Sequence, residues 1–496
     1  TGFKHLRVWS PVPAMAQTPE KRPVAHVPVL STLKKARSQK LRFEDRLGDV
    51  VPEAEAALLA ELHDIVHGAP APFACGGQLR IPEAPKVVLK AGESFAIKPP
   101  TLRSNASDRF MWGVSKKDMQ NYVEDQTASL RGLCDKMLPA SFGHGQETKI
   151  DPTVRDALQL AAEAFEVNIP EASLVSVLRE LQQKLKIDSE VQAELYALNV
   201  YQKDGHFARH KDTPRGEDML GSLVVCLPAF FEGGELLIEQ GLDQKQFFRS
   251  RRFAPENWRK PIPEELTNLE WCAFFADVDH MVKKVSAGMR ITVSYLLRRK
   301  DGQDASSEIP RCLSEDSQHQ LMREAFQRAA QSPLLTEGKS IGFPCFFLYT
   351  NTEVFPKKAD AETPLLENIV QKLKGRDAIV ANSALAAGLK VRLVPYLSHD
   401  YSGEFDDGPA EIPLKRFPGK KRVPRRMSDD SIEVHFDTSL DEDSRMEGQP
   451  DVWVMTMERA ASRCAGSTEW NAEGYFGNEA SGISFYVKAG LHVSID

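Results

Sequence analysis

The spacing of apolar and polar residues changes along the chain, and the change separates helical from extended regions. Apolar positions that recur at helical spacing predict helices at 52–67, 116–136, 152–166, 171–186 and 317–331. Short apolar runs bounded by Gly or Pro predict strands at 75–81, 86–90 and 94–98. Further runs without long helices between them follow at 195–201, 222–227, 235–238, 271–275 and 290–297. This second series predicts an antiparallel all-β unit, a sandwich or jelly roll.

Together these elements predict an α+β protein in which a β-rich core is flanked by helices. A Pro- and Lys/Arg-rich stretch over 1–50 is typical of an irregular arm, and the polar stretch 300–315 is typical of a linker. The expected parts are an arm and helix at 1–66, a domain at 67–300 with its core at 193–298, a linker and helix at 301–330, and a C-terminal mixed α/β region of unknown role at 331–496.

Composition narrows the class of protein and its surroundings. Hydrophobic residues make up 42% and charged residues 27% of the 496 residues, which is ordinary for a soluble globular protein. No apolar run approaches the roughly 18 residues of a membrane helix. The net charge of -7 gives no general attraction to nucleic acid or anionic lipid, so we expect no membrane partner and regard nucleic acid as a poor candidate. Seven scattered cysteines without a CxxC pair indicate a reducing compartment, cytoplasmic or nuclear.

The strongest chemical signal is the run Tyr201-Gln-Lys-Asp-Gly-His-Phe-Ala-Arg-His210-Lys-Asp212, with His280 following in a later strand. A non-haem Fe(II) oxygenase binds its metal with two imidazoles and one carboxylate, which leaves three positions for a bidentate 2-oxo acid and for O2. Side chains on a strand repeat every two residues, so His210 and Asp212 can point the same way while Lys211 points elsewhere. The sequence therefore predicts an Fe(II) site formed by His210, Asp212 and His280.

A cation for the cosubstrate follows ten residues after His280. The far carboxylate of 2-oxoglutarate requires a cation deep in the barrel, and the guanidinium of Arg290 offers bidentate geometry and a permanent charge. In the strand that begins there, period two places Arg290, Thr292 and Ser294 on one face, which we expect to point inward. Tyr201 can add a phenolic hydrogen bond to the same carboxylate.

The sequence contains a second His-x-Asp, His435-Phe-Asp437, with His492 at a workable distance. No cation follows His492 before the sequence ends at Asp496. Because one isolated His-x-Asp is expected by chance in a chain of this size, we interpret this second set as structural.

Other polar residues near the first site have ordinary interpretations. His206 lies in the turn before the ligand strand, where a hydrogen-bonded or exposed histidine is commoner than a metal ligand. Arg209 and Lys211 are expected to be solvated, although with the loop cations Arg249, Arg251 and Arg252 they could hold an anionic substrate. The basic segment 415–426 is interpreted as a solvated loop, with a nuclear import signal or phosphate patch as the minority hypothesis.

Over 195–297 these residues resemble the catalytic domain of prolyl 4-hydroxylases. That family combines Tyr-x3-Gly-x-aromatic-x2-His-x-Asp with a Gly-Gly pair, here Gly233-Gly234, and with a His that Lys or Arg follows ten residues on. The resemblance implies a double-stranded β-helix, Fe(II), 2-oxoglutarate, O2, succinate as coproduct and ascorbate as an optional reductant. Arg290 in place of lysine is similar to the oxygen-sensing prolyl hydroxylases rather than to the collagen-modifying enzymes.

A looser resemblance covers more of the chain. The segments 73–77, 138–143, 373–377 and 474–480 are similar to parts of large fungal and protist proteins that carry a 2-oxoglutarate oxygenase domain. It suggests that the flanking regions belong to one architecture with the core.

Three functional hypotheses remain at this point. The favoured one is hydroxylation of a C–H bond with 2-oxoglutarate as small-molecule cosubstrate, with a free or peptide-bound prolyl residue as first substrate. The second is oxygenation of a nucleobase or small metabolite, supported only by the basic segment 415–426. The third is a scaffold that binds no metal, which would be expected to lack a ligand, whereas all three ligands and the cation are present.

Overall fold

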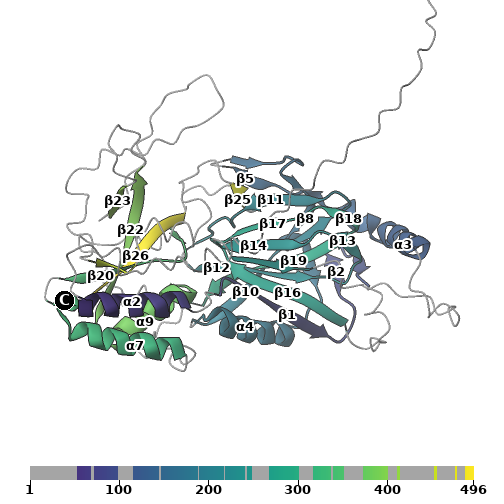
Figure 1. Cartoon of the computed structure of the whole chain (residues 1–496). Coiled ribbons are helices and arrows are strands. Elements are labelled where there is room, and N and C mark those ends of the chain that lie inside the picture. The colour runs from purple at the N-terminus through teal and green to yellow at the C-terminus, as the bar shows by residue number, and fades with distance from the viewer. Residues whose placement is uncertain are drawn as a thin grey trace, which may run out of the picture. The chain divides into compact units, whose positions relative to one another are not determined.

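The computed structural model describes residues from Glu53 to Ile495 with gaps (Figure 1). Pro52–Asp496 forms one compact unit. The described residues are 53–68, 72–98, 116–144, 147–187, 189–216, 218–240, 243–248, 267–300, 317–336, 339–350, 373–399, 410–413, 452–454, 475–476 and 486–495. Within these ranges no helix is both long and apolar enough to cross a bilayer.

The largest sheet has seven antiparallel strands in the order β1-β16-β12-β19-β10-β8-β4. Four strands come from the series of apolar runs predicted between 193 and 300, so that part of the prediction is confirmed. The bounds are β1 Ala74–Ile81, β16 Thr267–Phe275, β12 Met219–Cys226, β19 Arg290–Arg299, β10 Val191–Tyr201, β8 Leu158–Ala161 and β4 Leu138–Pro139.

A second antiparallel sheet has five strands in the order β15-β14-β17-β11-β7. Side chains of the two sheets meet, because the Ser222 hydroxyl donates to Asp212 and the Phe274 ring lies 4.6 Å from the His280 ring. The candidate ligands Asp212 and His280 therefore lie between the sheets. The bounds are β15 Asp243–Phe247, β14 Leu236–Gln240, β17 Asp279–Val282, β11 His206–His210 and β7 Arg155–Asp156.

The centre of the large sheet is buried on both faces, and its strand β12 is buried at every position. On β16, Phe274 points toward the second sheet. Trp271 points to the opposite face, toward helix α4 (Glu171–Leu185), and the Lys184 ammonium of this helix lies 5.5 Å from the Trp271 ring centroid. Burying a side chain such as Trp271 stabilises the fold by about 2–3 kcal/mol. The five described cysteines are free thiols, and four of them are buried, where a thiol packs as a small hydrophobic side chain.

Four of the five predicted helices are confirmed, and the fifth is wrong. The confirmed helices are α2 Glu53–Gly68, α3 Lys116–Cys134, α4 Glu171–Leu185 and α7 Ser317–Ala330. The segment 152–166 instead forms the short strands β7 and β8, with β9 (Phe165–Val167) after them.

Pairing with β10 overrides the helix propensity of this segment. Leu160 lies opposite Leu198 and Gln159 opposite Asn199, and the Gln159 side-chain amide donates to the Asn199 side-chain oxygen at 3.0 Å. The Ala, Leu and Glu residues of 152–166 favour a helix by only tenths of a kcal/mol each, less than the hydrogen bonds and burial that the sheet edge supplies. The spacing of residues within 152–166 gives no information about β10, the strand with which this segment pairs.

The C-terminal region, defined as the described residues from Ser317 onward, contains both helices and strands. Its main sheet follows the order β23-β22-β26-β20-β24, and β21 pairs with β26. Helices α7 and α9 (Gly375–Ala386) pack together, and α7 also contacts α2 (Figure 1). The strands are β20 Ser340–Pro344, β21 Tyr349–Thr350, β22 Lys390–His399, β23 Ala410–Pro413, β24 Val452–Trp453 and β26 Tyr486–Ser494. The predicted domain boundaries near 300 and 330 stay predictions.

Three small sheets complete the described strands. They follow the orders β3-β2-β9, β13-β18 and β25-β5-β6. The predicted strands 86–90 and 94–98 correspond to the first of these sheets. The bounds are β2 Lys86–Leu89, β3 Ser94–Ala96, β5 Phe142–His144, β6 Glu147–Lys149, β13 Phe231–Gly233, β18 Val285–Gly288 and β25 Tyr475–Phe476.

Asp377, in the first turn of α9, is a buried carboxyl that ties the helix to the loop before β21. It accepts the backbone N–H groups of Phe346 at 2.8 Å and Phe347 at 3.1 Å, and the Tyr349 hydroxyl at 2.9 Å. Burial raises the pKa of Asp377 from 3.8 to about 7, against the three hydrogen bonds and the nearby Arg376, all of which lower it.

We expect this carboxyl to make the stability of the chain fall as the pH rises through neutrality. Its pKa is higher in the folded than in the unfolded state, so its contribution is complete below the unfolded value and is lost as the pH passes about 7. Between about pH 5 and about pH 8, the thermal unfolding midpoint of the wild type should fall relative to that of Asp377→Asn. Parallel profiles would show that Asp377 does not titrate there.

Candidate metal centre

Two paired strands bring the predicted ligands together. β11 ends at His210, and its partner β17 places His280 directly opposite. Asp212 follows two residues after the end of β11, and its backbone N–H donates to the Ala276 carbonyl at 3.1 Å. The antiparallel register thus brings together His210 and His280, which are 70 residues apart in the sequence.

Each of the three side chains offers a ligand atom, and these atoms lie within 4.8 Å of one another. His280 Nε2 is 3.6 Å from Asp212 Oδ1, and the two imidazole centroids are 4.1 Å apart. Both histidines are buried and Asp212 is half-buried. Among the described residues this is the one group of three or more His, Cys, Asp or Glu side chains that could hold a metal.

The imidazoles are oriented for metal binding by backbone carbonyls. His210 Nδ1 lies 2.8 Å from the Ala208 oxygen, and His280 Nδ1 lies 3.0 Å from the Val278 oxygen. Because a carbonyl only accepts, each Nδ1 carries the proton and each Nε2 keeps its lone pair for a metal. Burial, and to a lesser extent the neighbouring His280, hold the pKa of His210 well below its ordinary value. His210 is therefore neutral near pH 7, and the neutral imidazole is the form that binds metals.

The carboxylate of Asp212 is oriented from the large sheet. The Ser222 hydroxyl in β12 donates to Asp212 Oδ2 at 2.6 Å, which leaves Oδ1 facing His280. Ser222 was not predicted as a site residue, although it lies at the start of a predicted strand. Aromatic rings enclose the cluster: Phe207 stacks on His210 with ring centroids 3.6 Å apart, and Phe274 lies beside His280.

Arg290 is a buried cation without a protein anion among the described residues. The residue is 1% exposed, its Nε has no hydrogen-bond partner, and within that part of the chain its guanidinium forms no ion pair. The guanidinium carbon lies 5.1 Å from the Tyr201 ring centroid and 5.3 Å from that of Phe248. Because an unpaired buried charge is costly, this surrounding fits a ligand carboxylate.

The register of β10 and β19 sets the other predicted cosubstrate residues. Tyr201 lies directly opposite Arg290, and Thr292, which is 2% exposed, lies opposite Asn199. Ser294 is two residues further along β19, about 13 Å from Arg290 by strand rise, and its hydroxyl accepts the Asn199 amide at 3.3 Å. Tyr201 and Thr292 are therefore near neighbours of Arg290, whereas Ser294 is held by Asn199.

The glycine pair named in the sequence lies against Arg290. Gly233 and Gly234 both have left-handed backbone, with φ of +68° and +66°. A Cβ at Gly234 would lie 2.8 Å from a Val285 methyl carbon and 3.3 Å from the Arg290 Cδ. The pair therefore permits a turn close to the guanidinium that larger residues would obstruct.

A second buried guanidinium, Arg155 in β7, also reaches the site and was missed in the sequence. Its Nη2 donates to the Asn199 side-chain oxygen at 2.9 Å, and its guanidinium carbon lies 4.5 Å from the centroid of Phe207, the ring stacked on His210. Burial lowers the pKa of Arg155. The side chain nevertheless stays charged, because the ordinary pKa of a guanidinium is very high. It was missed because its segment was assigned to a helix.

The flanking residues divide between confirmed and wrong interpretations. His206 is no ligand: its two ring nitrogens lie 3.1 Å from the carbonyl oxygens of Asp204 and Thr153. Arg209 is half exposed and paired with Glu239, as expected of a surface cation. The solvated interpretation of Lys211 is wrong, because its side chain is 16% exposed and binds Asp277 and Asp279.

The remaining candidates lie mostly outside the described residues. These are His435, Asp437, the loop cations Arg249, Arg251 and Arg252, and the basic segment 415–426. His492 is described: it is buried in β26, where burial lowers its pKa to about 4.

Comparisons with solved structures find oxygenases. The chain is similar to a 2OG-Fe(II) oxygenase family oxidoreductase from Burkholderia pseudomallei, at 19% identity over 36% of this chain and 81% of that one, with a TM-score of 0.22. A Pseudomonas putida prolyl-4-hydroxylase matches at 13% identity over 49% of this chain and all of that one, with a TM-score of 0.22. A Trichoplax adhaerens prolyl hydroxylase, in complex with a hypoxia inducible factor peptide fragment, matches at 12% identity over 50% and 94%, with a TM-score of 0.23.

No protein-family description and no curated protein matches the sequence. The looser similarity to fungal and protist proteins finds no support in these comparisons. At TM-scores this low the solved structures carry no conclusion about function, which has to come from the residues of the site.

Proposed function

We propose that this chain is an Fe(II)- and 2-oxoglutarate-dependent dioxygenase that hydroxylates a C–H bond. The observation that carries the proposal is the pairing of the His210, Asp212 and His280 cluster with a buried guanidinium, Arg290, that lacks an anion among the described residues. Two neutral imidazoles and one carboxylate are the donor set of this class of iron site. The proposal includes a double-stranded β-helix as the fold of the two facing sheets.

Each residue has a defined task in this proposal. His210, Asp212 and His280 would hold the iron, while Ser222 and the carbonyls of Ala208 and Val278 keep the three side chains oriented. Arg290 would bind the far carboxylate of 2-oxoglutarate, with Tyr201 and Thr292 beside it. When bound, Fe(II) with 2-oxoglutarate and O2 supplies the oxidation that places one oxygen atom in the substrate and releases succinate and CO2.

The aromatic enclosure has a task as well. Phe207 and Phe274 exclude water from the faces of the two imidazoles, which strengthens electrostatic interactions within the site. For the substrate we propose a prolyl residue in a peptide or protein, on the basis of the residue pattern from Tyr201 to Asp212 and its spacing to His280 and Arg290.

Anaerobic addition of Fe(II) and then 2-oxoglutarate tests the proposal. A weak visible charge-transfer band that requires both additions is expected, because a bidentate 2-oxo acid must contact the metal. Absence of the band would favour a metal-free scaffold. Mass spectrometry of peptides, nucleic acids and metabolites before and after turnover, searching for the gain of one oxygen atom, then separates a prolyl substrate from a nucleobase or a metabolite.

A further inference from the structure

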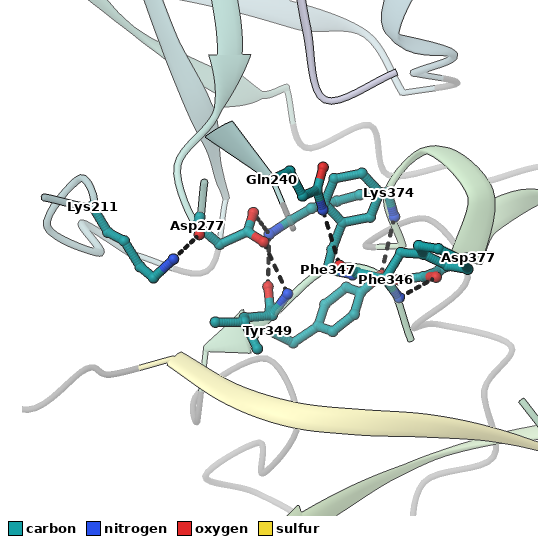
Figure 2. Close-up of polar contacts among 9 residues, drawn as sticks. Lys211, Gln240, Asp277, Phe346, Phe347, Tyr349, Lys374 and Asp377 are labelled. Atoms are coloured by element: carbon teal, nitrogen blue, oxygen red, sulfur yellow. Dashed lines mark hydrogen bonds and ion pairs between the residues drawn. The ribbon is translucent and has the colours of Figure 1, made fainter. Parts of the chain in front are cut away.

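A buried ion pair joins the C-terminal region to the turn that precedes His280. This turn, residues 276–278, connects β16 to β17. The Lys374 ammonium donates to Asp277 Oδ1 at 2.9 Å, and the two side chains are 3% and 2% exposed (Figure 2). Lys374 immediately precedes α9, so the partners come from different parts of the chain.

Both charged groups have further partners. Asp277 Oδ2 accepts the Leu348 N–H at 2.9 Å, and the Lys374 ammonium also donates to the Leu348 carbonyl at 2.9 Å. The same ammonium lies 5.1 Å from the Tyr349 ring centroid. A buried ion pair with this many hydrogen bonds defines one position for the turn, because any shift would strand a charge.

The opposite side of the same turn is bonded to the metal ligands. The Ala276 carbonyl accepts the Asp212 N–H, and the Val278 carbonyl accepts from His280 Nδ1. Between them, the Asp277 carbonyl accepts from Lys211, the residue that separates His210 from Asp212, at 2.8 Å. Three consecutive carbonyls therefore each contact a ligand or the residue between two ligands.

We propose that Lys374 is a positioning residue for the metal centre, and that the C-terminal region thereby holds His280 and Asp212 in their binding geometry. This inference rests on the proposed function, since it assigns the cluster to a metal. Lys374 does not touch the metal. It fixes the Asp277 side chain, Asp277 fixes the turn, and the carbonyls of the turn fix the ligands. Groups that hydrogen-bond directly to metal ligands, as the carbonyls of this turn do, typically change metal affinity about 10- to 100-fold.

Two variants separate positioning from a general contribution to folding. Lys374→Met removes the ammonium and leaves the Asp277 carboxylate buried without its cation, so both stability and metal affinity should fall. In the double variant Asp277→Asn/Lys374→Met neither member of the pair is charged, and the amide oxygen of the introduced asparagine can still accept the Leu348 N–H. The double variant should recover much of the unfolding midpoint.

The measurement is a titration with Co(II) alone, followed by its visible absorption, at a temperature well below the unfolding midpoint of each variant. We expect both variants to bind Co(II) about 10-fold more weakly than the wild type, the lower end of the range for direct partners of metal ligands. Continued weak binding by the double variant, despite its recovered stability, is the result that a purely structural ion pair would not give. Wild-type affinity in the double variant would overturn the positioning role.

A matched control is Phe326→Leu, which removes packing between α7 and Phe343 in the C-terminal region without contacting the turn. It should lower stability and leave Co(II) affinity within about twofold. An equal loss of affinity in this control would mean that any destabilisation has the same effect, and the positioning role would be rejected. If the wild type itself bound no Co(II) and gave no charge-transfer band, the proposed function would fail and this inference with it.

Discussion

Replacing His210 with alanine should abolish both metal binding and succinate production. The change removes one of three ligands and opens a buried site to water, since His210 is stacked against Phe207 and faces His280. We expect Fe(II) affinity to fall by at least about 100-fold, beyond the effect of losing an indirect partner. Asp212→Ala should behave in the same way. The measurements are anaerobic Fe(II) titration and succinate release from 2-oxoglutarate.

His435→Ala provides the matched control, because the sequence contains His435-Phe-Asp437 as a second candidate pair. That variant should retain wild-type succinate release. Loss of turnover in His435→Ala with the fold preserved would return the second pair to consideration, and near-normal turnover in His210→Ala would show that the ligands are assigned wrongly.

The second large effect is expected at Arg290, where cosubstrate binding should be lost while iron binding is retained. Arg290→Ala leaves the far carboxylate of 2-oxoglutarate buried without a partner, at a cost of roughly 2–5 kcal/mol. Affinity for 2-oxoglutarate should then fall by roughly 30-fold or more. Arg290→Lys should be milder, because it retains the charge but loses the planar fork. Titration of 2-oxoglutarate into the iron-loaded proteins measures all three affinities.

Arg298, on the same strand, is a suitable control for Arg290. Its guanidinium already pairs with the carboxylates of Glu194 and Asp218, so it has no anion to recruit from solution. Arg298→Ala should leave 2-oxoglutarate affinity within about twofold. If Arg290→Ala also bound 2-oxoglutarate as the wild type does, the anion would be held elsewhere, and Arg155 would be the next guanidinium to test.

The sequence predicts the elements of the core well where local pattern and tertiary environment agree. The strand series between 193 and 300 and the inward polar face of β19 follow from short apolar runs and period two. The three candidate ligands are found from residue type and spacing, and their ligand atoms lie within 4.8 Å of one another. Their roles remain predictions until the variants above are measured.

The local pattern of apolar and polar residues does not show which distant segments will pack against a given residue. Arg155 was missed because 152–166 has helix-forming composition, whereas pairing with β10 and β11 makes it extended. Lys211 is predicted to be solvated because it flanks the ligand strand, and no neighbouring residue in the sequence indicates that the Asp277 carbonyl accepts from it. The Lys374 ammonium is likewise an ordinary surface residue by type, and burial next to Asp277 is a property of the assembled fold.

The Asp277 and Lys374 ion pair also constrains how this protein can evolve. A single substitution at either position leaves one buried charge without its partner. We therefore expect the residues at positions 277 and 374 to be substituted together among related proteins. A lineage that shed the C-terminal region would lose the lysine and should carry an uncharged residue where this chain has Asp277. The two sheets that carry the candidate ligands are therefore not expected to be transferred by gene fusion without the C-terminal region, unless the residue at position 277 is replaced as well.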